Sequence, residues 1–210
     1  MSGPGLAPLR TMRRATAGSW TSPAAWTQMP RGLSCPERSA PRECRREGGS
    51  MDQKAQASAG PSADERSAMN EAIDRALRAA RESGKSGIAA TVLKAGKVVA
   101  TGENEVHLQC DPTQHAEMVA ITRAAQVLGT TDLTGCVLIS TLQPCEMCLS
   151  AFRFARMERV IFAATQAKVP EKYFAFPHLR LDDFQRGTNF TFVAGVGEEL
   201  VLHLYATGDE

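Results

Sequence analysis

Two short clusters of metal-binding side chains constrain this chain more than any other feature. Residues 115–117 read His-Ala-Glu and residues 144–148 read Pro-Cys-Glu-Met-Cys, so 30 positions separate the histidine from the first cysteine. Proteins hold zinc through Cys sulfur and His nitrogen, and a catalytic zinc keeps three protein ligands and an open position for water. His115, Cys145 and Cys148 supply three such ligands, so the fold must bring the two clusters together.

The local pattern also indicates how the second cluster folds and what Glu117 does. Cys145 and Cys148 are three residues apart, which places them on one face of a helix, and Pro144 suits its first turn. Zinc lowers the pKa of a water molecule that it binds to about 7, and a nearby carboxylate can then carry protons between water and substrate. Glu117, two residues from His115, is the candidate catalytic group.

Other interpretations of these residues are less specific. A lone Cys-x-x-Cys could be a redox pair or half of a structural zinc site, and a structural site needs a fourth Cys or His. Cys110 and Cys136 are the nearby candidates, but an apolar run follows Cys136, which indicates burial. The conjunction of both clusters therefore favours a catalytic zinc over a structural or decayed site.

The 210-residue chain changes character near residue 50. Residues 1–50 contain six of the eleven prolines and both tryptophans, with eight Arg against three Glu. Residues 51–210 contain 16 Lys and Arg against 20 Asp and Glu, a net charge of −4. We expect one zinc-dependent domain over 51–210, and a disordered tail or a mis-annotated upstream extension over 1–50.

Three origins are open for residues 1–50. Their Arg-rich, acid-poor composition loosely resembles an organelle transit peptide, and they could equally be a disordered extension. We favour an over-extended gene start, with the natural protein beginning at Met51, because codons for Glu-Gly-Gly at 47–49 can spell a ribosome-binding stretch.

A chain that starts at Met51 should be as stable and as active as the full chain, because no periodic apolar surface precedes it. Thermal unfolding and turnover of the two forms check this prediction. Loss of folding on removal of residues 1–50 would contradict both the disorder and the gene-start interpretations.

The remaining composition describes the compartment. There is no continuous apolar segment of a secretory signal and no run of eighteen apolar residues that could span a membrane. Six cysteines without a secretory signal are reduced, metal-bound or buried more often than paired. The expectation is a soluble cytoplasmic protein with no membrane partner.

Apolar periodicity alternates between strands and helices. Strands are expected at 88–93, 98–101, 137–141, 159–164 and 190–193, and helices at 64–81, 115–128, 145–155 and, more weakly, within 173–186. Residues 198–205 fit either type. The expected fold is an α/β, three-layer α/β/α sandwich around a mixed sheet of about five strands.

With these elements in order, the chain resembles the cytidine-deaminase-like superfamily, in its branch of guanine deaminases, cytosine deaminases and tRNA adenosine deaminases. The resemblance covers nearly all of residues 60–195. Residues 111–117 (Asp-Pro-Thr-Gln-His-Ala-Glu) resemble the family's D-P-T-A-H-A-E, and residues 102–104 its G-x-N. Residues 141–145 resemble T-x-E-P-C, with Gln143 in place of Glu. The His-x-Glu and Pro-Cys-x-x-Cys pair is typical of zinc nucleobase deaminases.

The resemblance implies a set of roles. Zn²⁺ is the cofactor, held by His115, Cys145 and Cys148, with Glu117 as the proton carrier. Asn104, otherwise a plain turn residue, would hydrogen-bond the substrate base. The backbone N–H groups of Ala116 and Cys145 would face the base and the metal-bound oxygen, and the protein would be a homodimer.

Two stretches depart from the family. Residues 87–91 read Gly-Ile-Ala-Ala-Thr where family members carry P-[FV]-G-A, which puts the substrate in doubt. Residues 173–178 match none of the three branches and fall where family members close the pocket. Phe174 and Phe176 are the candidates for that lid, with buried packing as an equal alternative. A solvated helix face is favoured for Asp182 and Asp183.

Three functions compete: deamination of a free nucleobase or nucleoside of guanine or cytosine type, deamination of adenosine in tRNA, and a catalytically silent zinc-binding role. An RNA-binding enzyme needs basic surface for phosphates, and the acidic balance of residues 51–210 disfavours tRNA as a partner. The intact Glu117 disfavours the silent role. A small-molecule base or nucleoside is therefore the leading substrate.

Overall fold

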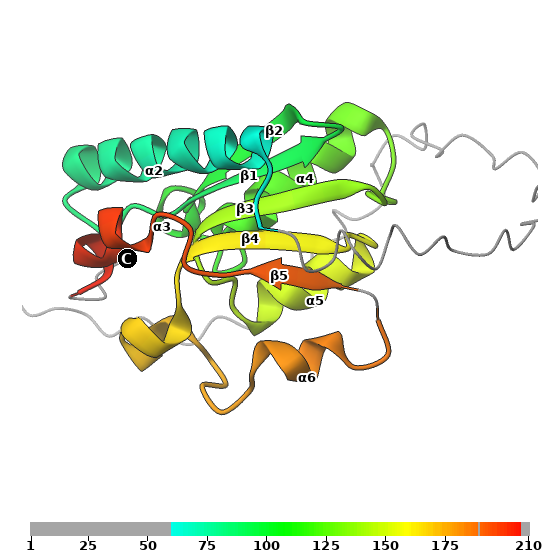
Figure 1. The fold of residues 1–210 in the computed structure, drawn as a ribbon. Coiled ribbons are helices and arrows are strands. Elements are labelled where there is room, and N and C mark those ends of the chain that lie inside the picture. The colour runs from blue at the N-terminus through cyan, green and yellow to red at the C-terminus, as the bar shows by residue number, and fades with distance from the viewer. Residues whose placement is uncertain (1–59, 189, 207–210) are drawn as a thin grey trace, which may run out of the picture. The chain divides into compact units, whose positions relative to one another are not determined.

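A five-stranded mixed sheet forms the centre of the described part of the chain (Figure 1). The computed structural model describes residues 60–188 and 190–206, so the expectations about residues 1–50 lie outside it. The strands are β1 Ala89–Lys94, β2 Lys97–Glu103, β3 Cys136–Leu142, β4 Arg159–Ala164 and β5 Thr191–Val193. Their order in the sheet is β2-β1-β3-β4-β5, antiparallel on both sides of β1 and parallel from β3 to β5.

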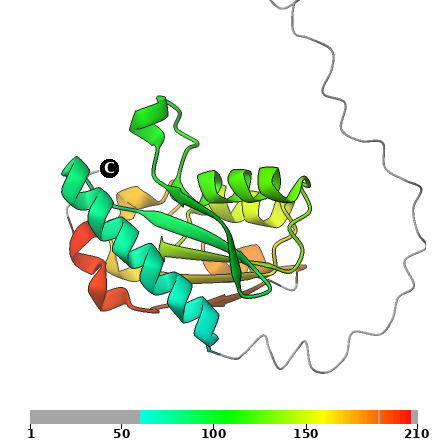
Figure 2. The same ribbon diagram turned by 90° about the horizontal axis from the view of Figure 1, so that it is seen from above.

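Helices cover both faces of this sheet, which confirms the predicted three-layer α/β/α fold. The helix α2 (Ala63–Ser83) packs on one face, and α4 (Ala116–Leu128) and α5 (Glu146–Phe154) pack on the other (Figure 2). Local sequence explains the limits of α2. Ser62 and Glu65 form a capping box at its start, and Gly84 ends it in a left-handed conformation.

The core lies where the sheet meets these helices. The central strands β3 and β4 are buried along nearly their whole length, as expected for parallel strands covered on both faces. Gly87, just before β1, permits close packing of α2, because a Cβ atom there would lie 1.8 Å from the carbonyl oxygen of Ala76. One departure from the family pattern therefore has a packing role in this chain.

In the last third of the chain, the structure confirms the weak helix expected within 173–186 and corrects the prediction for 198–205. Within 173–186, only Leu181–Gln185 (α6) is an α-helix, and the preceding turns are the short 3₁₀ helices η1 (Gln166–Lys168) and η2 (Glu171–Tyr173). The 198–205 segment is neither α-helix nor strand but two 3₁₀ turns, η3 (Glu198–Leu200) and η4 (Leu202–Tyr205).

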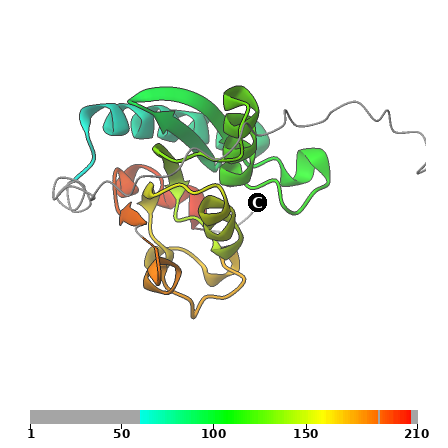
Figure 3. The ribbon, with the colours of Figure 1, turned by 90° about the vertical axis from the view of Figure 1, so that its right-hand side faces the viewer.

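A short helix, α3 (Val106–Gln109), was not predicted, because four residues are too few to show helical periodicity. Figure 3 shows the segment between β4 and β5, drawn in amber and orange, beside α5 and away from β2. Across the described ranges, every helix is too short or too polar to cross a lipid bilayer.

Candidate active site

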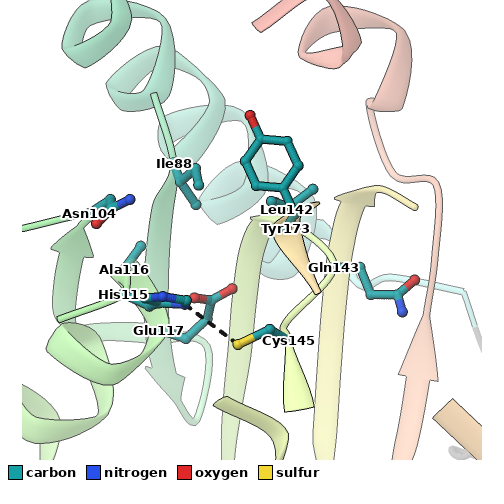
Figure 4. Close-up of a pocket in the computed structure, with 9 residues that line it drawn as sticks. All are labelled: Ile88, Asn104, His115, Ala116, Glu117, Leu142, Gln143, Cys145 and Tyr173. Carbon is teal, nitrogen blue, oxygen red and sulfur yellow. Dashed lines mark hydrogen bonds between the residues drawn. The ribbon is translucent and has the colours of Figure 1, made fainter. Parts of the chain in front are cut away.

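The predicted metal ligands meet where two helices begin. His115 is the N-cap residue of α4 and Cys145 is the N-cap residue of α5, with Cys148 in the first turn of α5. The Nδ1 atom of His115 lies 3.5 Å from the Sγ atom of Cys145 (Figure 4). It lies 3.8 Å from the Sγ atom of Cys148. The two sulfur atoms are 3.6 Å apart. Among the described residues, these three form the group that could hold a metal ion.

The spacing of the three atoms fits a tetrahedral zinc ion. Zinc–sulfur bonds of about 2.3 Å and zinc–nitrogen bonds of about 2.0–2.1 Å put two sulfurs about 3.8 Å apart and a sulfur about 3.6 Å from a nitrogen. The observed separations of 3.5, 3.6 and 3.8 Å match these edges closely. The donor set and its geometry therefore suit zinc with one face left open.

The environment also favours the thiolate that zinc requires. The interaction with Cys148 and the nearby His115 lower the pKa of Cys145 to about 4, despite its partial burial. The hydrogen bond with Cys145, together with burial, raises the pKa of Cys148 well above its ordinary range. The lowered pKa favours the thiolate of Cys145 at the start of α5, where the helix dipole also favours negative charge.

Glu117 lies beside these ligands without occupying a position among them. It is 4% exposed, and its Oε1 atom accepts a hydrogen bond of 2.8 Å from the hydroxyl of Ser140 on β3. Its Oε2 atom is 3.5 Å from the sulfur of Cys148. Burial, and next the charge of Cys145, raises the pKa of Glu117. Ser140 thus orients the carboxylate, a role that sequence reasoning missed.

A small cavity of about 20 Å³ opens onto Glu117 and two of the ligands, and we call it the inner cavity. Its lining residues are Ile88, Asn104, His115, Ala116, Glu117, Leu142, Gln143, Cys145 and Tyr173 (Figure 4). Every predicted metal, proton-transfer and base-binding residue therefore lines this cavity except Cys148, which completes the ligand group, and the two phenylalanines.

Asn104 both stabilises a turn and lines the inner cavity. Its Oδ1 atom accepts a hydrogen bond of 3.1 Å from the Val106 N–H, and the residue is part of the lining of the inner cavity. Gly102, two residues earlier, packs on α4, because a Cβ atom there would lie 2.3 Å from the carbonyl oxygen of Ala116. Ala116 opens α4, so its N–H is among the four that intrahelical bonds leave open.

A second, larger cavity of about 460 Å³, the outer cavity, adjoins the first. Both cavities are lined by His115, Cys145 and Tyr173. Phe176 is 53% exposed and lines the outer cavity, whereas Phe174 is buried in the hydrophobic core and lines neither. The aromatic residue at the inner cavity is Tyr173, which sequence reasoning placed in the lid segment but did not single out.

Comparison with known proteins agrees with this geometry. The model of the cytidine and deoxycytidylate deaminase zinc-binding region matches residues 62–164. The guanine deaminase of Bacillus subtilis is 39% identical over 106 residues, which cover 49% of this chain and 68% of that protein. The tRNA-specific adenosine deaminase of Aquifex aeolicus is 42% identical over 94 residues, which cover 45% of this chain but only 62% of that protein.

A solved structure from a study of A-to-I editing by tRNA:A34 deaminases superimposes with a TM-score of 0.57 and 29% identity, covering 66% of this chain and 98% of that one. Fold and metal-ligand group together define a zinc-binding deaminase. The chain belongs to the cytidine-deaminase-like superfamily.

Proposed function

We propose that the protein is a zinc-dependent hydrolase that converts the exocyclic amine of a free nucleobase or nucleoside, of guanine or cytosine type, to a carbonyl and releases ammonia. The observation that carries this proposal is the entrance to the site. Among the described residues that line the outer cavity, Lys172 is the one lysine or arginine, and it shares this cavity with the carboxylate of Glu146. Such an entrance lacks the array of cations that a folded RNA requires.

The residues of the site divide the chemistry among them. His115, Cys145 and Cys148 would hold the zinc ion, which when bound activates water for attack on the ring. Glu117 takes one proton from the attacking water and delivers it to the ring nitrogen; it then takes the second proton from the hydroxyl group added to the ring and delivers it to the leaving amine. Asn104 and the Ala116 N–H fix the edge of the ring, and the surrounding apolar walls exclude water.

Deamination of adenosine in tRNA is the second candidate. The similarity to tRNA-specific adenosine deaminases supports it, because the Aquifex aeolicus enzyme is as similar to this chain as the Bacillus subtilis guanine deaminase is. A catalytically silent zinc-binding role is the third, and the buried, hydrogen-bonded Glu117 speaks against it.

An ammonia-release panel separates these candidates. Guanine, cytosine, guanosine and cytidine are tested beside an anticodon stem–loop with adenosine at the wobble position, with a Glu117→Gln preparation as the control for contaminating deaminases. We expect turnover of at least one base or nucleoside with kcat/KM on the order of 10⁴ M⁻¹s⁻¹ or more. Inosine formed in the RNA, with no ammonia from the small molecules, would reverse the ranking; no product from any substrate would favour the silent role.

We also propose that the protein acts as a homodimer. Val127 near the end of α4 is 67% exposed, and Phe154 at the end of α5 is 89% exposed. These two helices pack against each other, so both apolar groups belong to one layer of the fold. Exposed apolar surface of this kind is typical of contact sites. Light scattering after gel filtration would give twice the mass of the chain, and a monomer mass would refute the assignment.

A further inference from the structure

The first residue of α5 holds a segment from a distant part of the chain. Glu146 follows the ligand Cys145 and is 8% exposed. Its Oε2 atom accepts a hydrogen bond of 3.2 Å from the Ala175 N–H, and its Oε1 atom accepts one of 3.1 Å from the Phe176 N–H. Both carboxylate oxygens are thus engaged by successive backbone amides. Bonds to an ionised acceptor are the stronger kind of hydrogen bond.

Other contacts fix the same segment on either side. The Tyr173 hydroxyl lies 2.8 Å from the hydroxyl of Ser86. The Gln166 N–H donates to the Oε1 atom of Gln143 at 3.0 Å, and the Gln166 side-chain amide donates to the Pro177 carbonyl at 3.2 Å. Residues 173–177, which we call the strap, are therefore held at the start, the middle and the end.

The strap determines the size of the space beside the metal ligands. Three residues line both cavities, and Tyr173 is the one among them that is not a metal-ligand candidate. The inner cavity, at about 20 Å³, has room for about one water molecule, and a purine or pyrimidine ring cannot enter it as it stands. The outer cavity, at about 460 Å³, lies in the range of small-molecule sites. Entry of a ring thus requires the lining to widen, and Tyr173, in the strap, is the shared lining residue that can move without disturbing the metal-ligand group.

We propose that Glu146 is a positioning residue of the deamination site. By binding the Ala175 and Phe176 amides, it holds the Tyr173 ring in the lining that the two cavities share. A substrate ring enters by displacing the strap, and the two bonds re-form to close the site over it. The proposal rests on the proposed function for the nature of the substrate. The two hydrogen bonds from the Ala175 and Phe176 amides to Glu146, which we call the tie, do not depend on that function.

Hydrogen exchange measured on the full chain without substrate tests the tie directly. In Glu146→Ala, the exchange rate at the Ala175 and Phe176 amides should rise about tenfold or more. The reason is that a hydrogen bond to a charged group changes the equilibrium constant for opening by about tenfold or more. Glu146→Gln keeps a single acceptor oxygen, so it should release one amide more than the other. The control Glu171→Gln removes a charge from an exposed residue near the strap and should leave both amides unchanged.

The steady-state kinetics of Glu146→Gln distinguish a positioning role of Glu146 from general damage to the fold. The substrate is the base or nucleoside that is turned over best in the panel. With it, Glu146→Gln should raise KM about tenfold and change kcat by less than about twofold. This pattern indicates that the lost interaction stabilises the ground state and the transition state equally. Zinc content should stay at that of the unmodified protein. Unchanged exchange at both amides in Glu146→Ala, or loss of zinc with an equal fall in kcat, would overturn the proposal. A panel without turnover would defeat the proposed function, and the exchange result would still decide the tie.

Discussion

Replacing Glu117 with Gln should abolish turnover while one zinc per chain remains bound. Glutamine has the same shape as glutamate and can still accept the hydrogen bond from Ser140, so the fold and the ligands should be undisturbed. It cannot take up or release the protons that deamination requires, and positioned proton transfer contributes on the order of 10²–10⁴-fold to a rate. Because one carboxylate carries several transfers here, we expect a loss at the upper end of that range. Ammonia release and metal analysis on the same preparation check both halves.

Ser140→Ala tests whether the orientation of Glu117 matters separately from its ability to transfer protons. It removes the group that orients Glu117 at 2.8 Å but leaves the carboxylate in place. A misplaced proton carrier still works part of the time, so activity should fall by less than in Glu117→Gln, with zinc retained. If Glu117→Gln keeps substantial activity, the proton must travel by another group and our assignment is wrong.

The sequence was sufficient to predict most of the fold and the residues that meet at the site. The His-x-Glu and Pro-Cys-x-x-Cys clusters each precede a strong apolar helix pattern, and the structure places both ligand-bearing helix starts together. The sequence also predicted a mixed sheet. A hairpin joins β1 to β2, which makes this pair antiparallel, whereas β3, β4 and β5 are joined by longer segments and pair in parallel. In these elements local pattern and tertiary packing agree.

Prediction failed where long-range contacts replace local pattern. The strap and its flanks contain no periodic apolar run, and the segment is held by Glu146, Gln166 and Ser86. Such hydrogen bonds leave no trace in spacing, so Tyr173 could not be separated from Phe174 and Phe176 beforehand. Ser140 was missed for a related reason. A serine within a buried strand is unremarkable until the register of β3 sets it against the start of α4.

Loss of a metal ligand should have the other large effect. In Cys148→Ala, zinc content should fall well below one per chain, activity should disappear, and thermal stability should fall, because a metal that binds only the folded state stabilises that state. Cys148 is fully buried and lies 3.6 and 3.8 Å from the donor atoms of its two partners, so its loss leaves two protein ligands where a catalytic zinc needs three.

Cys136→Ala separates metal loss from simple core damage. Cys136 is also a buried thiol, at 2% exposure, but it belongs to the hydrophobic core and not to the ligand group. Its replacement should cost about 1–2 kcal/mol of stability as a small core truncation, while zinc and activity are kept. X-ray absorption at the zinc edge of the unmodified protein should give two sulfur ligands, one imidazole nitrogen and one further light atom. A third sulfur ligand, or full zinc occupancy in Cys148→Ala, would mean that the metal is held by a different and closed set of residues, which could not activate water.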